Sequence, residues 1–204
     1  MANKGTEIAL NLGLRQDFMI GYVAFEQTKA LISTFGYAEG AITSPITCGI
    51  ITQCLLLRPG AFLEIGTRYG GSALVARRFT NKVVTIDPGY DEEYRAVIEK
   101  AKITDITKIV KPSENVKRLP KADYTVGFID GLHEYDQIMK YDFPLMEKYV
   151  KGFVIFDDVD IAQVDEAIVD LAVRGNWKLL YYHYPSTAVI TNLELSKKLH
   201  LGLV

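Results

Sequence analysis

The hydrophobic positions of this chain change their spacing about a quarter of the way along it. Between residues 17 and 35 large apolar side chains recur with the period of one helix face: Phe18, Tyr22, Phe25, Ile32 and Phe35. Ser44 and Pro45 then supply a cap and a first-turn proline. They predict a second helix that ends near Leu57.

After residue 60 the pattern changes to short apolar runs that alternate with helical segments. The runs are residues 61–66, 83–87, 108–110, 124–130, 153–158, 178–184 and 188–191. Runs that are apolar throughout are typical of parallel strands covered on both faces. Only Pro185, Ser186 and Thr187 separate the last two runs, which is hairpin length. We therefore predict an α/β fold: a Rossmann-like, doubly wound sheet of seven mostly parallel strands with the last strand antiparallel, plus N-terminal helices.

A chain of 204 residues with 49% apolar and 24% charged residues is expected to form a single domain. Within it we expect a helical extension (residues 1–58), a Rossmann-like core (residues 59–192) and a C-terminal tail (residues 193–204). In the core, a helix starting at Asp160 is expected to have a capping box with Gln163 and to end at Gly175.

Charge and composition narrow the range of partners. The chain has 23 basic and 25 acidic residues without a basic run, so no nucleic acid partner is expected. It has neither a signal-peptide pattern at its start nor an apolar stretch of membrane length. We expect a cytoplasmic protein with a small-molecule acceptor, and the aromatic N-terminal helices favour a homodimer.

Cys48 and Cys54 lie on different faces of the predicted second helix, so buried thiols are expected there rather than a disulfide or a metal pair.

The stretch FLEIGTRYGGS, residues 62–72, runs from a predicted strand into a predicted helix and contains three glycines. Glycine lets a backbone approach a ligand closely, and the start of a helix offers unpaired N–H groups. Arg68 stands where the dinucleotide fingerprint needs glycine, and no P-loop lysine follows. Asp87 ends the next strand, where a carboxylate can accept from both hydroxyls of a ribose. A tight turn beside a surface acid is the alternative, which the position of Asp87 disfavours.

The form acid-x-Gly-x-x-x-Gly-x-Ser in this loop resembles the first motif of class I S-adenosylmethionine-dependent methyltransferases, and the resemblance covers roughly residues 45–192. It implies that one group of residues surrounds the methionine part of S-adenosylmethionine: Glu64, Gly66, Thr67, Gly70 and Ser72. It also implies that Asp87 binds the ribose. Ser113 follows the third strand, where members of this family often contact the adenine.

Three acids end neighbouring strands. Asp130 ends the fourth predicted strand, and Asp157 and Asp158 end the fifth. Because the carboxyl ends of parallel strands share one edge of a sheet, we expect these side chains to converge near the cofactor. Clustered carboxylates repel one another and favour a bound cation, and oxygen donors suit Mg²⁺ or another divalent cation such as Ca²⁺ or Mn²⁺. An acid that caps a helix or binds a loop amide is the alternative.

The sequence Asp-Gly-x-His-x-Tyr from residue 130, followed by Phe-Asp-Asp at residues 156–158, resembles metal-dependent small-molecule O-methyltransferases. The branch that acts on macrolide sugars and cephamycin precursors is similar, and so is catechol O-methyltransferase. The resemblance implies that the metal ligands are Asp130, Asp157 and Asp158, with Asp130 also beside the cofactor. His133 falls at the position of the general base, a task that imidazole suits at neutral pH. A histidine hydrogen-bonded at a helix start is the alternative.

These observations predict a divalent-metal-assisted O-methyltransferase that uses S-adenosylmethionine and acts on a hydroxyl of a small molecule. Two alternatives stay open: methylation of nitrogen or a carboxylate without a metal, and a module that binds S-adenosylmethionine without turnover. A cover over the acceptor is expected from the N-terminal helices or from a tyrosine-rich stretch, which contains Tyr181, Tyr182 and Tyr184.

Overall fold

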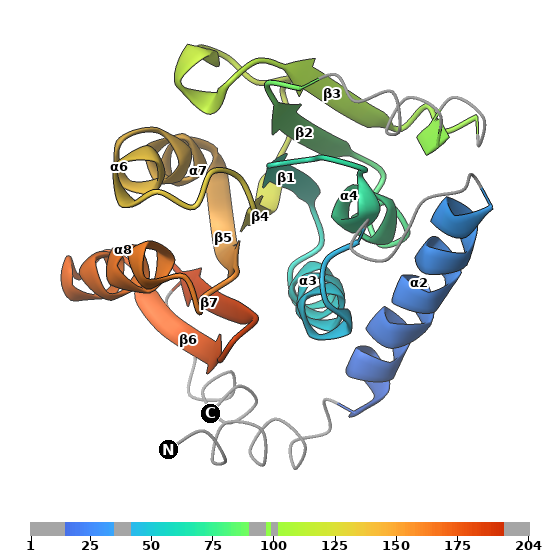
Figure 1. Ribbon diagram of the computed structural model, residues 1–204, viewed down its shortest axis with the longest axis horizontal. Helices are drawn as coiled ribbons and strands as arrows, with labels where there is room; N and C mark the ends of the chain where they lie inside the picture. Colours follow the sequence, from blue (N-terminus) through green and yellow to red (C-terminus); the bar gives the residue numbers. More distant parts are fainter. Residues whose placement is uncertain (1–14, 35–41, 90–96, 99–101, 194–204) are drawn as a thin grey trace.

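The computed structural model describes residues 15–34, 42–89, 97–98 and 102–193 and contains one seven-stranded sheet (Figure 1). Its strands are β1 (Ala61–Ile65), β2 (Val83–Asp87), β3 (Ile106–Val110), β4 (Tyr124–Ile129), β5 (Val150–Asp157), β6 (Lys178–His183) and β7 (Thr187–Thr191). The strand order is β3-β2-β1-β4-β5-β7-β6, and β7 runs in the direction opposite to the other six strands. The predicted fold, including the reversed last strand, is confirmed.

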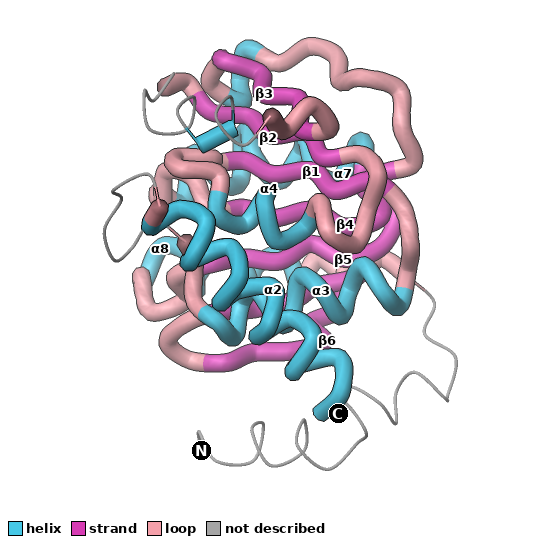
Figure 2. The backbone as a smooth tube through the Cα atoms, turned by 90° about the vertical axis from the view of Figure 1, so that its right-hand side faces the viewer, coloured by secondary structure: helices cyan, strands magenta, loops and turns pink. Residues whose placement is uncertain are grey.

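Helices cover both faces of the sheet. On one side lie α2 (Arg15–Ser33), α3 (Pro45–Leu57) and α4 (Gly71–Ala76), and on the other lie α6 (Tyr135–Gln137), α7 (Phe143–Tyr149) and α8 (Ala162–Val173) (Figure 1). A 3-10 turn, η1 (Ser113–Asn115), follows β3, and a π-helical turn, η2 (Ile138–Asp142), joins α6 to α7. Figure 2 shows the strands crossing behind α2, α3 and α4. This layering is that of a doubly wound fold.

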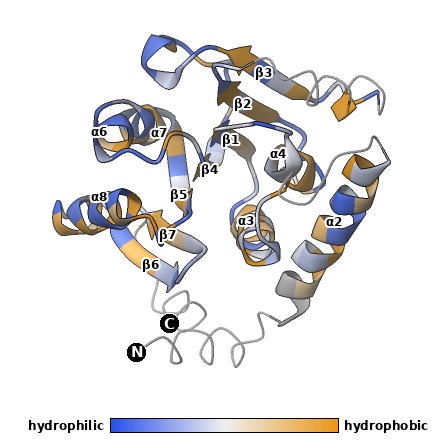
Figure 3. Ribbon diagram, viewed as in Figure 1, coloured by the Kyte–Doolittle hydropathy of each residue, from blue (hydrophilic) through white to orange (hydrophobic). Residues whose placement is uncertain are grey.

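Each face of the sheet has its own apolar core, because successive side chains of a strand point to opposite faces. Phe62, Phe128 and Phe153 pack with Ile51 and Leu55 of α3. The next residue along each of these strands packs on the other face, with side chains of α7 and α8: Leu63, Ile129 and Val154. In Figure 3 the central strands β1 and β2 are accordingly coloured as hydrophobic. Burial on both faces explains why these strands are apolar at most positions.

The ends of several elements differ from the sequence expectation. β3 starts two residues and β5 three residues before the predicted runs, at Ile106 and Val150. Ser44 caps α3 as predicted, since its Oγ accepts from the backbone N–H of Thr47 at 3.1 Å. The predicted capping box at Asp160 is wrong, because α8 starts at Ala162 and Ile161 holds the cap position without a side-chain hydrogen bond.

The N-terminal helices pack on the core through a small apolar cluster made of Ala24, Phe25, Cys48 and Val75. Cys48 and Cys54 are both free and buried, as predicted, and burial raises the pKa of each thiol. Within the part of the chain that the structure describes, the helices are too short or too polar to cross a bilayer. The start of the helical extension and residues 194–204 of the predicted tail lie outside the described residues.

Candidate active site

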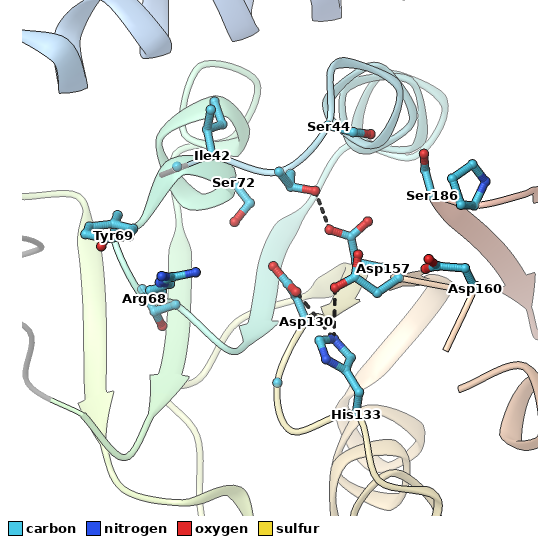
Figure 4. Close-up of a pocket in the computed structure, with 16 residues that line it drawn as sticks. Ile42, Ser44, Arg68, Tyr69, Ser72, Asp130, His133, Asp157, Asp160 and Ser186 are labelled. Carbon is cyan, nitrogen blue, oxygen red and sulfur yellow. Dashed lines mark hydrogen bonds and ion pairs between the residues drawn. The ribbon is translucent and has the colours of Figure 1, made fainter. Parts of the chain in front are cut away.

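A cavity of about 530 Å³ opens at the carboxyl ends of β1, β4 and β5 (Figure 4). The loop after β1 forms one wall, the acids after β4 and β5 form another, and the segment before α3 and the turn between β6 and β7 complete it. The lining residues are Ile42, Thr43, Ser44, Thr67, Arg68, Tyr69, Gly71, Ser72, Asp130, Gly131, His133, Asp157, Asp158, Asp160, Pro185 and Ser186. The cavity therefore joins both predicted motifs at one edge of the sheet.

The glycine loop after β1 fits closely against the end of β4. Gly66 has a φ of +90°, and a Cβ at this position would lie 1.9 Å from the carbonyl oxygen of Asp130. Gly70 also has left-handed backbone, with φ 79°, and caps α4. Backbone hydrogen bonds of 2.9 Å join Gly66 N to Ile86 O and Asp130 N to Ile65 O. Only glycine at residue 66 permits this contact. The backbone of the predicted cofactor loop is therefore packed directly against the backbone of Asp130, a predicted metal ligand.

Asp87, at the end of β2, holds the glycine loop in place. Its Oδ2 accepts from the backbone N–H groups of Thr67 at 2.8 Å and Arg68 at 3.0 Å, and its Oδ1 accepts from that of Gly89 at 2.7 Å. A carboxylate has room for about four such bonds. Asp87 therefore fixes the shape of the loop and keeps capacity for a ligand hydroxyl.

Glu64 lies behind the cavity rather than in its lining. Its side chain is completely buried and accepts a hydrogen bond from Ser72 Oγ, while Ser72 itself lines the cavity. Burial raises the pKa of Glu64 well above its usual value, and the negative charge of Asp130 adds to this effect. Glu64 therefore fixes the position of the Ser72 hydroxyl by accepting its hydrogen bond.

Asp130, His133 and Asp158 lie close together, whereas the sequence prediction for the strand ends named Asp130, Asp157 and Asp158. One potential ligand atom from each lies within 4.8 Å of the others. His133 Nε2 is 3.7 Å from Asp130 Oδ1 and 3.6 Å from Asp158 Oδ2 (Figure 4). The interaction with Asp130 raises the pKa of His133, and burial raises the pKa of Asp130. Asp158 has a φ of +49°, a conformation that aspartate tolerates better than most residues.

Asp157 is turned toward the N-terminal helices. It is 7% exposed, its Oδ1 accepts from Thr47 Oγ1 at 2.9 Å, and its Oδ2 accepts from Thr43 Oγ1. Burial, together with the negative charge of Asp130, raises the pKa of Asp157 to about 7. Of the three predicted metal ligands, Asp157 is thus the one whose oxygens already have hydroxyl donors.

Ser113, predicted to contact the adenine, lies buried outside the cavity lining. Its Oγ donates to Asp142 Oδ1 at 2.5 Å and accepts from Gln137 Nε2 at 2.9 Å. A Cβ on Gly131 would lie 3.7 Å from the other carboxylate oxygen of Asp142. The serine therefore connects η1 to η2 beneath the loop that carries His133.

Several residues that line the cavity were not predicted from the sequence to do so. Ile42, Thr43 and Ser44 precede α3, and Pro185 and Ser186 form the turn between β6 and β7. The tyrosine-rich stretch expected to cover the acceptor does not line the cavity: Tyr181, Tyr182 and Tyr184 are all absent from its lining. Ser44 and Pro45 carry a signal for a helix start, but nothing in the sequence ties such a start to a strand end more than a hundred residues away.

Solved structures similar to this chain are methyltransferases. A Podospora anserina methyltransferase, PaMTH1, bound to S-adenosylhomocysteine, has 16% identity and a TM-score of 0.61 over 84% of this chain and 87% of its own. TomG, an O-methyltransferase of Streptomyces achromogenes in complex with S-adenosylmethionine, has 18% identity and a TM-score of 0.60 over 82% and 88%. An O-methyltransferase of Bacillus cereus, in complex with S-adenosylhomocysteine, has 16% identity and a TM-score of 0.59 over 83% and 90%. At these identities the likeness shows a shared fold.

Curated protein sequences give no significant match to the chain. Residues 63–159 match a family model described as a methyltransferase domain. The matched segment contains the glycine loop, Asp87 and the whole stretch from Asp130 to Asp158. The match agrees with the predicted enzyme class at the level of a methyltransferase.

Proposed function

We propose that this protein transfers the methyl group of S-adenosylmethionine to a hydroxyl of a small molecule with the help of a divalent cation. The observation that carries the proposal is that the glycine loop and the cluster of Asp130, His133 and Asp158 line the same cavity. Its volume of about 530 Å³ lies within the range of small-molecule sites.

The donor is assigned to the side of the cavity formed by the glycine loop. Ser72 and the backbone around Thr67 line it there, and Asp87 lies behind the loop with one acceptor position to spare. The complexes of PaMTH1, TomG and the Bacillus cereus enzyme with S-adenosylmethionine or its product support this choice of donor.

The acid cluster fits a divalent cation. One carboxylate oxygen each of Asp130 and Asp158 lies within 4.8 Å of the other and of a ring nitrogen of His133, and Asp157 precedes Asp158 in the sequence. His133 Nε2 is shielded from solvent without a hydrogen-bond partner among the described residues. Asp130, Asp157 and Asp158 would hold the cation, as the sequence resemblance implies. Bound there, it would lower the pKa of an acceptor hydroxyl.

His133 is assigned as the base. In the proposed reaction the hydroxyl proton passes to the imidazole while the acceptor oxygen bonds to the methyl carbon. The bond between that carbon and the sulfonium sulfur breaks, and its electron pair leaves with S-adenosylhomocysteine as a neutral thioether. Without a bound cation, Asp130 raises the pKa of His133, and the charges of Asp158 and Asp157 add to this effect.

The test has a binding part and an activity part. Calorimetric titration with S-adenosylhomocysteine, with and without Mg²⁺, should show binding at micromolar concentrations. If no binding is seen even at high micromolar concentrations, the assignment of the donor is wrong. Transfer of labelled methyl groups to a panel of catechols, sugars and polyketides should stop on addition of a chelator. Asp130→Ala should abolish transfer, whereas Asp136→Ala, a change at an exposed acid paired with Lys140, should not. Activity that persists in chelator would instead favour metal-independent methylation.

A further inference from the structure

A chain of hydroxyl groups leads to the carboxylate of Asp157. Thr43 comes from the segment before α3, Thr47 from the first turn of α3, and Thr187 from the first residue of β7. Thr47 and Thr187 are both completely buried, and their Oγ1 atoms are hydrogen-bonded to each other. Ser44 Oγ lies 3.0 Å from Thr47 Oγ1. Three parts of the chain that are distant in sequence thus meet at one carboxylate.

The hydrogen bonds of this chain have a definite direction. An ionised carboxylate can only accept, so Thr43 and Thr47 each donate their single hydroxyl proton to Asp157. Thr47 Oγ1 has then no proton left for its other neighbours, and Thr187 must donate to it. Ser44 Oγ already accepts from the backbone N–H of Thr47, which leaves its own proton free to point to Thr47 Oγ1. Every proton in the chain is therefore directed toward Asp157.

This arrangement fixes both oxygens of Asp157. Thr43 holds Oδ2 and Thr47 holds Oδ1, so the carboxylate cannot rotate without breaking one of the two bonds. Two hydroxyl donors use about half of the acceptor capacity of a carboxylate, and the rest stays available to a ligand. Burial and the negative charge of Asp130 raise the pKa of Asp157, and the hydrogen bonds from the two threonines act in the opposite direction.

We propose that Thr43 and Thr47 are positioning residues that orient the Asp157 carboxylate for the cation. This inference rests on the proposed metal-assisted function. Groups that hydrogen-bond to a metal ligand commonly change metal affinity by about 10- to 100-fold when removed. It also gives the N-terminal helices a direct part in the site, because α3 carries Thr47 and the cavity wall before α3 carries Thr43.

The same helix offers a matched control. Thr52 is also completely buried in α3, but its Oγ1 has no hydrogen-bond partner among the residues that the structure describes. Thr47→Val and Thr52→Val therefore make the same chemical change on one helix, and only the first removes a donor to Asp157. Thr47→Ser keeps the hydroxyl and serves as the conservative rescue.

Mn²⁺ binding to the full-length protein, followed by the electron paramagnetic resonance signal of the free ion, tests the inference. We expect Thr47→Val and Thr43→Val to lower Mn²⁺ affinity by about tenfold or more. Thr47→Ser and Thr52→Val should keep the affinity of the wild type. All four variants should give the far-ultraviolet circular dichroism spectrum of the wild type, which shows that the fold is intact.

The outcomes separate the two proposals. If the wild type binds Mn²⁺ and both valine variants bind it equally well, the positioning role is refuted while the proposed function stands. If the wild type binds no Mn²⁺ at millimolar concentrations, the metal-assisted function falls, and the positioning role falls with it. Should Thr47→Val not fold, Thr43→Val decides, because Thr43 lies outside the helix and is only half-buried.

Discussion

Replacing Gly66 by alanine should damage both the stability and the ligand site of this protein. The new Cβ would lie 1.9 Å from the carbonyl oxygen of Asp130, so the ends of β1 and β4 must separate by more than about 1 Å to restore a normal contact. Left-handed backbone costs a residue with a Cβ about 1–2 kcal/mol, and crowding of a packed site costs about 1–3 kcal/mol more. We expect a loss of about 2–5 kcal/mol in the free energy of unfolding.

Gly175→Ala is the matched control for this prediction. Gly175 has a φ of +85°, close to that of Gly66, but a Cβ there would meet nothing within 4 Å. It should lose only the backbone cost, about 1–2 kcal/mol. Urea unfolding followed by circular dichroism measures both variants, and titration with S-adenosylhomocysteine should show weakened binding for Gly66→Ala alone. Equal losses of stability in the two variants would refute the steric argument.

Three further outcomes can be checked independently. Glu64 keeps its proton when folded at pH values at which the unfolded chain releases it, so its contribution to stability is present at low pH and is lost as pH rises. Glu64→Gln should therefore show a smaller fall in unfolding free energy than the wild type between pH 5 and pH 8, and parallel curves would contradict the assignment. Cys48 and Cys54 should react with a thiol reagent only after unfolding, because both are buried; rapid labelling of the native protein would contradict this. Phe128→Ala should cost about 3–5 kcal/mol in urea unfolding, whereas Val173→Ala, at a side chain that is 79% exposed, should stay within about 0.5 kcal/mol of the wild type.

The sheet could be predicted from the sequence because its central strands are buried on both faces. Such strands favour apolar side chains at most positions, and β1, β2, β4 and β5 are predominantly apolar. The start of β3 was less visible, since Ile106 and Thr107 belong to an edge strand with half-exposed positions. The start of β5 was hidden by Lys151 and Gly152, which are poor strand formers.

Features that depend on tertiary contacts were beyond the reach of sequence patterns. Gln163 has the spacing of a capping box with Asp160, yet its side-chain oxygen accepts from the backbone N–H of Tyr135 at 2.9 Å and so supports a different helix. Thr43 and Thr47 carry no motif of their own, because a threonine hydroxyl suits many surroundings. The proximity of Asp130 and Asp158 was accessible to prediction because the edge rule for parallel strands places the ends of β4 and β5 together. His133 was found only through the resemblance of its motif to a known family.

The position of β7 between β5 and β6 has a consequence for how the protein is made. β5 pairs with β4 on one side and with β7 on the other, and of the described strands β7 is the last to be synthesised. Until then the apolar run of β5 has an unpaired edge, which is a template for aggregation. Thr187 and the turn residue Ser186 also arrive with this final segment. The segment that covers the edge of β5 therefore also completes the cavity, and a product truncated before Thr187 should aggregate rather than act as a weak enzyme.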